Sequence, residues 1–217
     1  HKALYEDGTL DGQLAKFIDN TRYNESPSFS GQYSSILLQH SRQTDFQFFK
    51  DKPNFYKKIL EHIQLLSYQR TLIEIISDKD VLLSLNANKV IIDLADCASK
   101  TNKKEEEITH GIFSSVDTIL TESSDEIIEY FTKNEEFLKK MVSAALKLEK
   151  SHVIIDAFRT LDKLFKQVEY DLKDKITSLV RINFKELIRS SKKNDFTKAI
   201  LYYPIFWKQG IEVMTDY

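Results

Sequence analysis

The sequence has little of what hairpin-rich, disulfide-bonded or membrane-spanning proteins need. Among its 217 residues are five glycines, three prolines and one cysteine. So few turn residues argue against a sheet with many hairpins, and a single cysteine cannot form a disulfide framework. No apolar run approaches the ~20 residues of a membrane-spanning helix, and we expect no secretory leader. We therefore expect little or no β-structure and a water-soluble protein.

An excess of charge of one sign is also missing. The chain has 31 Lys and Arg against 33 Asp and Glu, which gives a formal net charge of −2. No overall basic field attracts nucleic acid or an anionic membrane, so neither is an expected partner. Cys97 lies in an apolar run with helical spacing, and we expect it to be a small buried side chain. A lone cysteine fits a reducing, intracellular compartment, which we take as the cytoplasm, with the nucleus as the alternative.

What the sequence does have is apolar residues at helical spacing along most of its length. They indicate roughly ten or eleven helices. We expect one helical-repeat domain over residues 1–217. Since the chain begins with His1 and not with methionine, we expect it to be a fragment of a longer protein.

Local signals predict where several helices begin and end. Residues 19–28 are expected to form a loop, with a helix resuming near Phe29. A short helix follows, and Pro53 is expected either to end it or to begin the next one. Residues 99–104 are expected to form a second loop. The acidic stretch 123–126 is expected to begin a short helix, and Ser151 to cap a long one.

Three segments share one pattern, in which a short apolar helix, a polar elbow and a second apolar helix follow each other. They are Phe46–Ile63, Leu82–Cys97 and Ile127–Ala144, and their starts are 36 and 45 residues apart. This spacing is close to the ~40–47 residues of HEAT and armadillo units. The sequence therefore predicts an armadillo/HEAT-like α-solenoid, with an irregular helical bundle as the alternative.

Residue patterns for catalysis or cofactor binding are sparse. The glycines are scattered, so no phosphate-binding loop is indicated, and there is no Gly-x-Ser-x-Gly turn. Glu-x-x-His occurs twice, at Glu107/His110 and Glu149/His152, a spacing used by di-metal helical bundles. However, the second pair is expected to straddle a helix break. We predict no catalytic, cofactor-binding or metal-binding residues, and therefore no cofactor and no enzyme.

Two features near the carboxyl end also have ordinary structural interpretations. The aromatic residues of the stretch 202–207 are more typical of a core than of an exposed binding strip. The basic cluster of Arg189, Lys192 and Lys193 is typical of a helix end, where cations suit the helix dipole.

A series of stretches has a characteristic order and spacing: 31–38, 46–49, 52–55, 58–63, 85–91, 112–120, 127–142 and 154–164. In this order the chain resembles the SAPS domain, the helical-repeat region of regulatory subunits that bind phosphatase-six, a type-2A-like Ser/Thr phosphatase. The resemblance runs from about residue 10 to 165. Residues 1–168 are therefore interpreted as SAPS-like and 169–217 as an unassigned helical continuation. Ser84 stands where the family often has tryptophan, so the chain resembles a divergent member.

This resemblance implies a non-catalytic scaffold that binds a phosphatase catalytic subunit and directs it to substrates. We expect a protein partner, and the elbow residues Asn54, Asn86 and Asn88 are the first candidates for contact with it. Helix-turn capping is their ordinary role. Two alternatives stay open at the level of sequence. One is an unrelated armadillo-like adaptor for another protein or peptide, and the other is a di-metal helical bundle enzyme.

Overall fold

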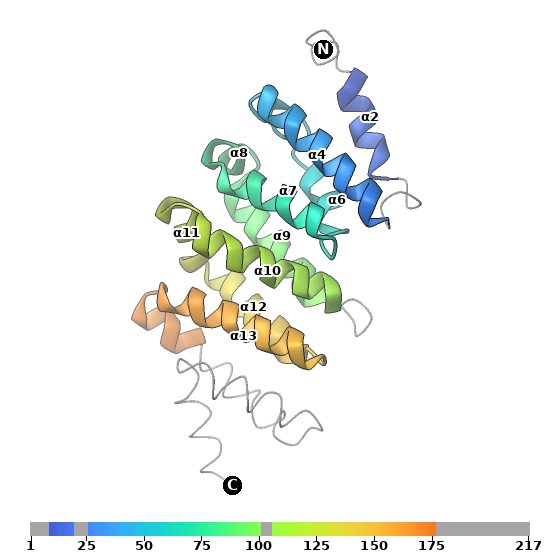
Figure 1. The fold of residues 1–217 in the computed structure, drawn as a ribbon. Coiled ribbons are helices and arrows are strands. Elements are labelled where there is room, and N and C mark those ends of the chain that lie inside the picture. Colours follow the sequence, from blue (N-terminus) through green and yellow to red (C-terminus); the bar gives the residue numbers. More distant parts are fainter. Residues whose placement is uncertain (1–8, 20–25, 101–105, 177–217) are drawn as a thin grey trace. The chain divides into compact units, whose positions relative to one another are not determined.

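The computed structural model describes residues 9–19, 26–100 and 106–176 (Figure 1). All regular structure in these ranges is α-helical, and they contain no β-strand. The predicted all-α class is therefore confirmed. Contacts within the chain divide it into two compact units, one up to Val90 and one from Ile91 onward. The expectation of a single domain over residues 1–217 stays a prediction.

The first unit contains six helices among its described residues, and the next helix crosses the boundary between the units. The six are α2 (Thr9–Phe17), α4 (Pro27–Gln43), α5 (Gln47–Asp51), α6 (Phe55–Leu60), α7 (Leu66–Ser77) and α8 (Lys79–Ser84). The boundary helix is α9 (Ala87–Lys100). Helix α4 packs against α5 and α7, and α7 also packs against α6 and α8.

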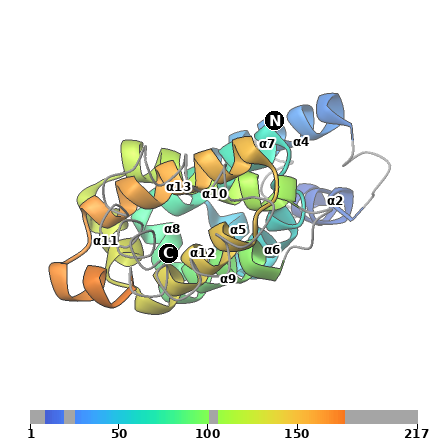
Figure 2. The same ribbon diagram turned by 90° about the horizontal axis from the view of Figure 1, so that it is seen from below.

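The second unit continues with four more named helices. They are α10 (Glu106–Glu122), α11 (Asp125–Thr132), α12 (Glu135–Lys147) and α13 (Ser151–Lys166). Residues 170–176 are helical as well, and the later aromatic and basic stretches lie outside the described residues. Helices α10 and α13 lie side by side (Figure 1, Figure 2), and α13 also contacts α11 and α12.

A repeat is visible in the order and length of the helices. The helices α4, α7, α10 and α13 begin 39, 40 and 45 residues apart. Each of the first three is followed by a short helix and then by another helix, and these pairs are the segments in which the sequence predicted a repeat. Within each unit the long helices run in the same direction (Figure 1). The structure is thus an all-α helical-repeat fold with the period of armadillo units.

Four local predictions differ in detail from the structure. Helix α4 begins at Pro27, not near Phe29, because proline at the first position of a helix needs no amide partner. Ser151 is the first residue of α13 and does not cap it, since Lys150 occupies the cap position. Cys97 is half-buried and not buried. The predicted loop over 99–104 begins later, because α9 continues to Lys100.

Side chains fix several of the helix ends. Asp78 accepts a hydrogen bond from the amide of Val81 at 3.0 Å, which caps α8. Asn134 accepts one from the amide of Phe137, also at 3.0 Å, which caps α12. Because a capping oxygen satisfies an amide that the helix leaves without a partner, both residues stabilise the start of the helix that follows.

Each unit has its own apolar core. The core of the first unit is rich in aromatic residues, and that of the second contains five fully buried phenylalanines. No helix of the described part of the chain is long and apolar enough to cross a membrane. The largest fully buried side chains are Ile18, Phe48, Phe49, Tyr56 and Tyr68 in the first unit, and Phe113, Phe131, Phe137, Phe158 and Phe165 in the second.

Buried Glu106 fixes the turn that precedes α13. Its carboxylate accepts hydrogen bonds from the backbone amides of Glu149 at 2.5 Å and Lys150 at 3.1 Å. The side chain therefore joins the start of α10 to the start of α13. A buried carboxylate is stable in such a place because two amides neutralise part of its charge.

Candidate functional site: a serine-lined groove between α4 and α7

The three asparagines predicted as contact residues lie exposed in the elbows of the first unit. Asn54 precedes α6 at its cap position, and its side chain accepts no capping hydrogen bond. Asn86 has a left-handed backbone with φ of 65°, and its side-chain oxygen accepts the amide of Lys89 at 3.4 Å. Asn88 lies in the first turn of α9. Asn86 thus has the ordinary capping role, and partner binding by the three residues stays a prediction.

The two Glu-x-x-His pairs come close to each other in the second unit. The rings of His110 and His152 are 5.8 Å apart between centroids. However, the other groups are already engaged: Glu107 pairs with Lys150, and His110 Nε2 lies 3.1 Å from Asp156 Oδ2. The hydrogen bond from Lys150 holds the pKa of Glu107 below its usual range. No group of three or more potential ligands in the described ranges is placed to hold a metal ion.

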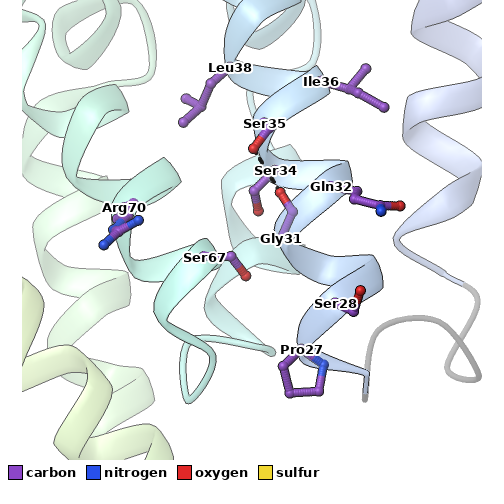
Figure 3. Close-up of a pocket in the computed structure, with 10 residues that line it drawn as sticks. All are labelled: Pro27, Ser28, Gly31, Gln32, Ser34, Ser35, Ile36, Leu38, Ser67 and Arg70. Atoms are coloured by element: carbon purple, nitrogen blue, oxygen red, sulfur yellow. Dashed lines mark hydrogen bonds between the residues drawn. The ribbon is translucent and has the colours of Figure 1, made fainter.

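A groove of about 740 Å³ lies along the line where α4 passes α7 (Figure 3). Helix α4 supplies most of its lining, and α7 supplies Ser67 and Arg70. Nearly half of the lining residues are serines. The residues from α4 are Pro27, Ser28, Gly31, Gln32, Ser34, Ser35, Ile36 and Leu38.

Small side chains on the facing sides of the two helices explain why the groove exists. Ser67 of α7 donates a hydrogen bond to Ser30 of α4, with 3.2 Å between the hydroxyl oxygens. One residue further along α4, a Cβ atom added at Gly31 would meet nothing within 4 Å. Positions at which large side chains would fill the space between the helices therefore carry small residues. The space above these residues stays open.

Ser34 differs from the other buried serines of α4. Ser30 and Ser41 donate their hydroxyl groups to backbone carbonyls, those of Pro27 and Leu37. The hydroxyl of Ser34 has no hydrogen-bond partner in the described structure, although the residue is only 4% exposed. Leaving a buried hydroxyl without a partner costs about 1–3 kcal/mol, so Ser34 is a donor that a ligand could satisfy.

Positive charge without a carboxylate partner is the second property of the groove. Arg70 is exposed and has no ion pair with any described residue, whereas nearby Arg42 of α4 pairs with Glu74 of α7. None of the lining residues in the described part of the chain is acidic. Helices α4 and α7 both begin at this end, and neither has a side-chain cap on its first amides. The arrangement favours an anionic group.

Two tyrosines of the lining helices α4 and α7 are buried in the core. Tyr33 of α4 donates its hydroxyl to the carbonyl of Leu14 at 2.8 Å, and its ring lies 6.1 Å from that of Tyr68 of α7. Burial raises the pKa of Tyr33 strongly above its usual value, with a smaller contribution from Tyr68. Burial also raises the pKa of Tyr68 from 10.0 to about 12. Both phenols of the folded unit are therefore neutral at neutral and mildly alkaline pH.

These raised pKa values predict a loss of stability in alkali. Tyrosines in the unfolded chain ionise near pH 10, so the stabilisation is complete below that pH and is lost as pH rises toward 12. Urea unfolding at pH 9, 10, 11 and 12 would measure it. The variant Tyr33→Phe should show a shallower decline above pH 10, because one of the two phenols is absent. An equal decline in both proteins would contradict this explanation.

Comparison of the chain with protein-family models, curated proteins and solved structures gives no match. The resemblance to the SAPS domain therefore stays a prediction.

Sequence reasoning did not find the groove residues Ser34, Ser67 and Arg70. A signal was present in α4, where small residues recur at positions 30, 31 and 34 on one side of the helix. The matching residue on α7 is 37 positions from Ser30, and only the fold brings the two together.

Proposed function

We propose that this chain is a non-catalytic scaffold that binds a protein partner, and that the partner is the catalytic subunit of a type-2A-like Ser/Thr phosphatase. The observation that supports protein binding is the open groove between two repeat helices, with exposed apolar residues on the same helices. Phe29 and Ile36 of α4 and Leu66 of α7 are 47%, 50% and 61% exposed. Of these three residues Ile36 lines the groove, and exposed apolar residues at a groove are typical of binding surfaces.

The phosphatase as partner is supported by the sequence resemblance over residues 10–165. The best-matching stretch, residues 31–38, is part of α4 and includes several residues that line the groove. A helical-repeat fold with the observed period is also what the resemblance implies. Because repeat folds bind many unrelated partners, the fold supports the scaffold and the resemblance supports the phosphatase.

Direct binding of purified proteins tests this proposal. The 217-residue chain would be immobilised, and the catalytic subunit of a phosphatase-six enzyme passed over it. We expect saturable binding with a Kd on the order of 1 μM or tighter, as for stable protein interfaces. A type-1 phosphatase catalytic subunit serves as the control and should bind at least about tenfold more weakly. Equal retention of both enzymes, or of neither, would remove the phosphatase from the proposal.

The armadillo-like adaptor for another protein is the second candidate, and the groove favours it independently of any resemblance. The charge and the hydrogen-bonding groups of the groove follow from its lining residues and do not depend on the resemblance. A scaffold of this kind would bind a peptide or protein segment whatever the outcome with the phosphatase.

A further inference from the structure

We propose that the groove between α4 and α7 binds a short acidic segment of a partner protein, with a carboxylate of that segment paired to Arg70. This inference rests on the proposed role of the chain as a protein-binding scaffold, but not on the phosphatase as the partner.

The charge of the groove matches one carboxylate. Arg70 supplies a single positive charge, and none of the described residues that line the groove is acidic. A guanidinium group binds a carboxylate through two parallel hydrogen bonds, which gives direction as well as affinity. A phosphate carries about twice that charge, and among the described lining residues Arg70 is the one cation that could match it.

The hydrogen-bonding groups match a polar acceptor beside that carboxylate. Figure 3 shows Ser34 and Ser67 on the facing sides of the two helices, with Arg70 further along α7. The Ser34 hydroxyl has no partner in the described structure. It can therefore donate to a backbone carbonyl or a carboxylate oxygen of the segment. The absence of a side chain at Gly31 lets the backbone of that segment approach α4 closely.

The size and borders of the groove match a segment of a few residues. A volume of about 740 Å³ lies in the range of pockets that enclose a ligand of that size. Pro27 and Leu38 supply apolar lining at two places along α4. We therefore expect the acidic residue to be flanked by apolar residues.

Peptide libraries of nine residues with a fixed centre test the proposal. One library carries Glu at the centre, and matched libraries carry Gln or phosphoserine there. The fluorescent libraries would be titrated with the 217-residue chain and binding followed by anisotropy. We expect the Glu library to bind at least about tenfold more tightly than the Gln library. Equal binding of the two would overturn the proposal, and tighter binding of phosphoserine would replace it with phosphopeptide recognition.

Charge reversal locates the binding on the groove. Arg70→Glu should weaken binding of the Glu library by at least about tenfold, because the carboxylate then meets a like charge. Lys89→Glu is the matched control, since Lys89 is exposed in the same unit, makes the same charge change and does not line the groove. If both variants weaken binding to the same degree, the effect is one of overall charge and the groove is not the site.

Substitutions at two positions separate binding from folding. Ser34→Ala should leave thermal stability unchanged or raise it, because it removes a buried hydroxyl without a partner, and yet weaken binding about fivefold. Gly31→Phe should fill the groove and abolish binding, whereas Gly31→Ala should keep most of it. A Ser34→Ala variant that binds like the original chain would exclude the hydroxyl from the site. Failure of the phosphatase to bind would leave all these expectations in place, so the two proposals fail separately.

Discussion

Replacement of Glu106 by alanine is expected to lower the free energy of unfolding of the second unit by about 3 kcal/mol. Glu106 is only 4% exposed, and its carboxylate receives the amides of Glu149 and Lys150. Alanine leaves both amides without their partner and opens a space at the start of α13. Since α10 and α13 pack against each other extensively, the loss should affect the packing of the whole unit.

Urea or guanidinium unfolding followed by circular dichroism would measure this loss. Glu106→Gln should lose about 1–2 kcal/mol, because the amide oxygen of glutamine can accept one of the two hydrogen bonds. The neighbouring Glu107 is the matched control. Its carboxylate pairs with Lys150 on the surface, so Glu107→Ala should leave the unfolding midpoint nearly unchanged. A similar loss for both alanine variants would show that Glu106 is not the residue that holds the turn.

The sequence was sufficient to predict the class and the repeat because those depend on local spacing. The phenylalanines of the stretch 46–49 lie within a few residues of each other, and Pro53 follows them, so a short helix with a defined end could be predicted. The elbow at Asn134 was also visible as a polar interruption between two apolar segments. In such cases the residues that decide the structure are neighbours along the chain.

The groove and the Glu106 turn could not be predicted, because the deciding residues are far apart along the chain. Glu106 and the amide of Glu149 are separated by 43 positions, and Ser30 and Ser67 by 37. The capping role predicted for Ser151 was wrong for the same reason, since the carboxylate of Glu106 holds the turn before α13. Local propensity could not show which side chain of α10 would accept the amides of the turn before α13.

Phe48 lies in the short helix α5, and its replacement by alanine is the second change with a large expected effect. We expect Phe48→Ala to lower the free energy of unfolding of the first unit by about 4 kcal/mol. Phe48 is 1% exposed, and its ring meets those of Phe49 and Phe55 edge-on at 5.3 and 4.8 Å between centroids. A helix of five residues is not stable alone, so packing of these rings is what keeps α5 folded. Removal of the central ring takes away both edge-on contacts and leaves a cavity that its rigid neighbours cannot fill.

Chemical unfolding and hydrogen exchange together would test this expectation, with Phe29→Ala as the matched control. Phe29 is 47% exposed on α4, so the same change of side chain should cost less than about 1 kcal/mol there. Phe48→Leu should recover roughly half of the loss, because it restores apolar volume but not the edge-on geometry. The amide of Lys52, which donates to the carbonyl of Phe48 at 3.1 Å, should exchange much faster in Phe48→Ala. Comparable losses of unfolding free energy for Phe48→Ala and Phe29→Ala would contradict this expectation. They would mean that contacts other than the aromatic packing stabilise α5.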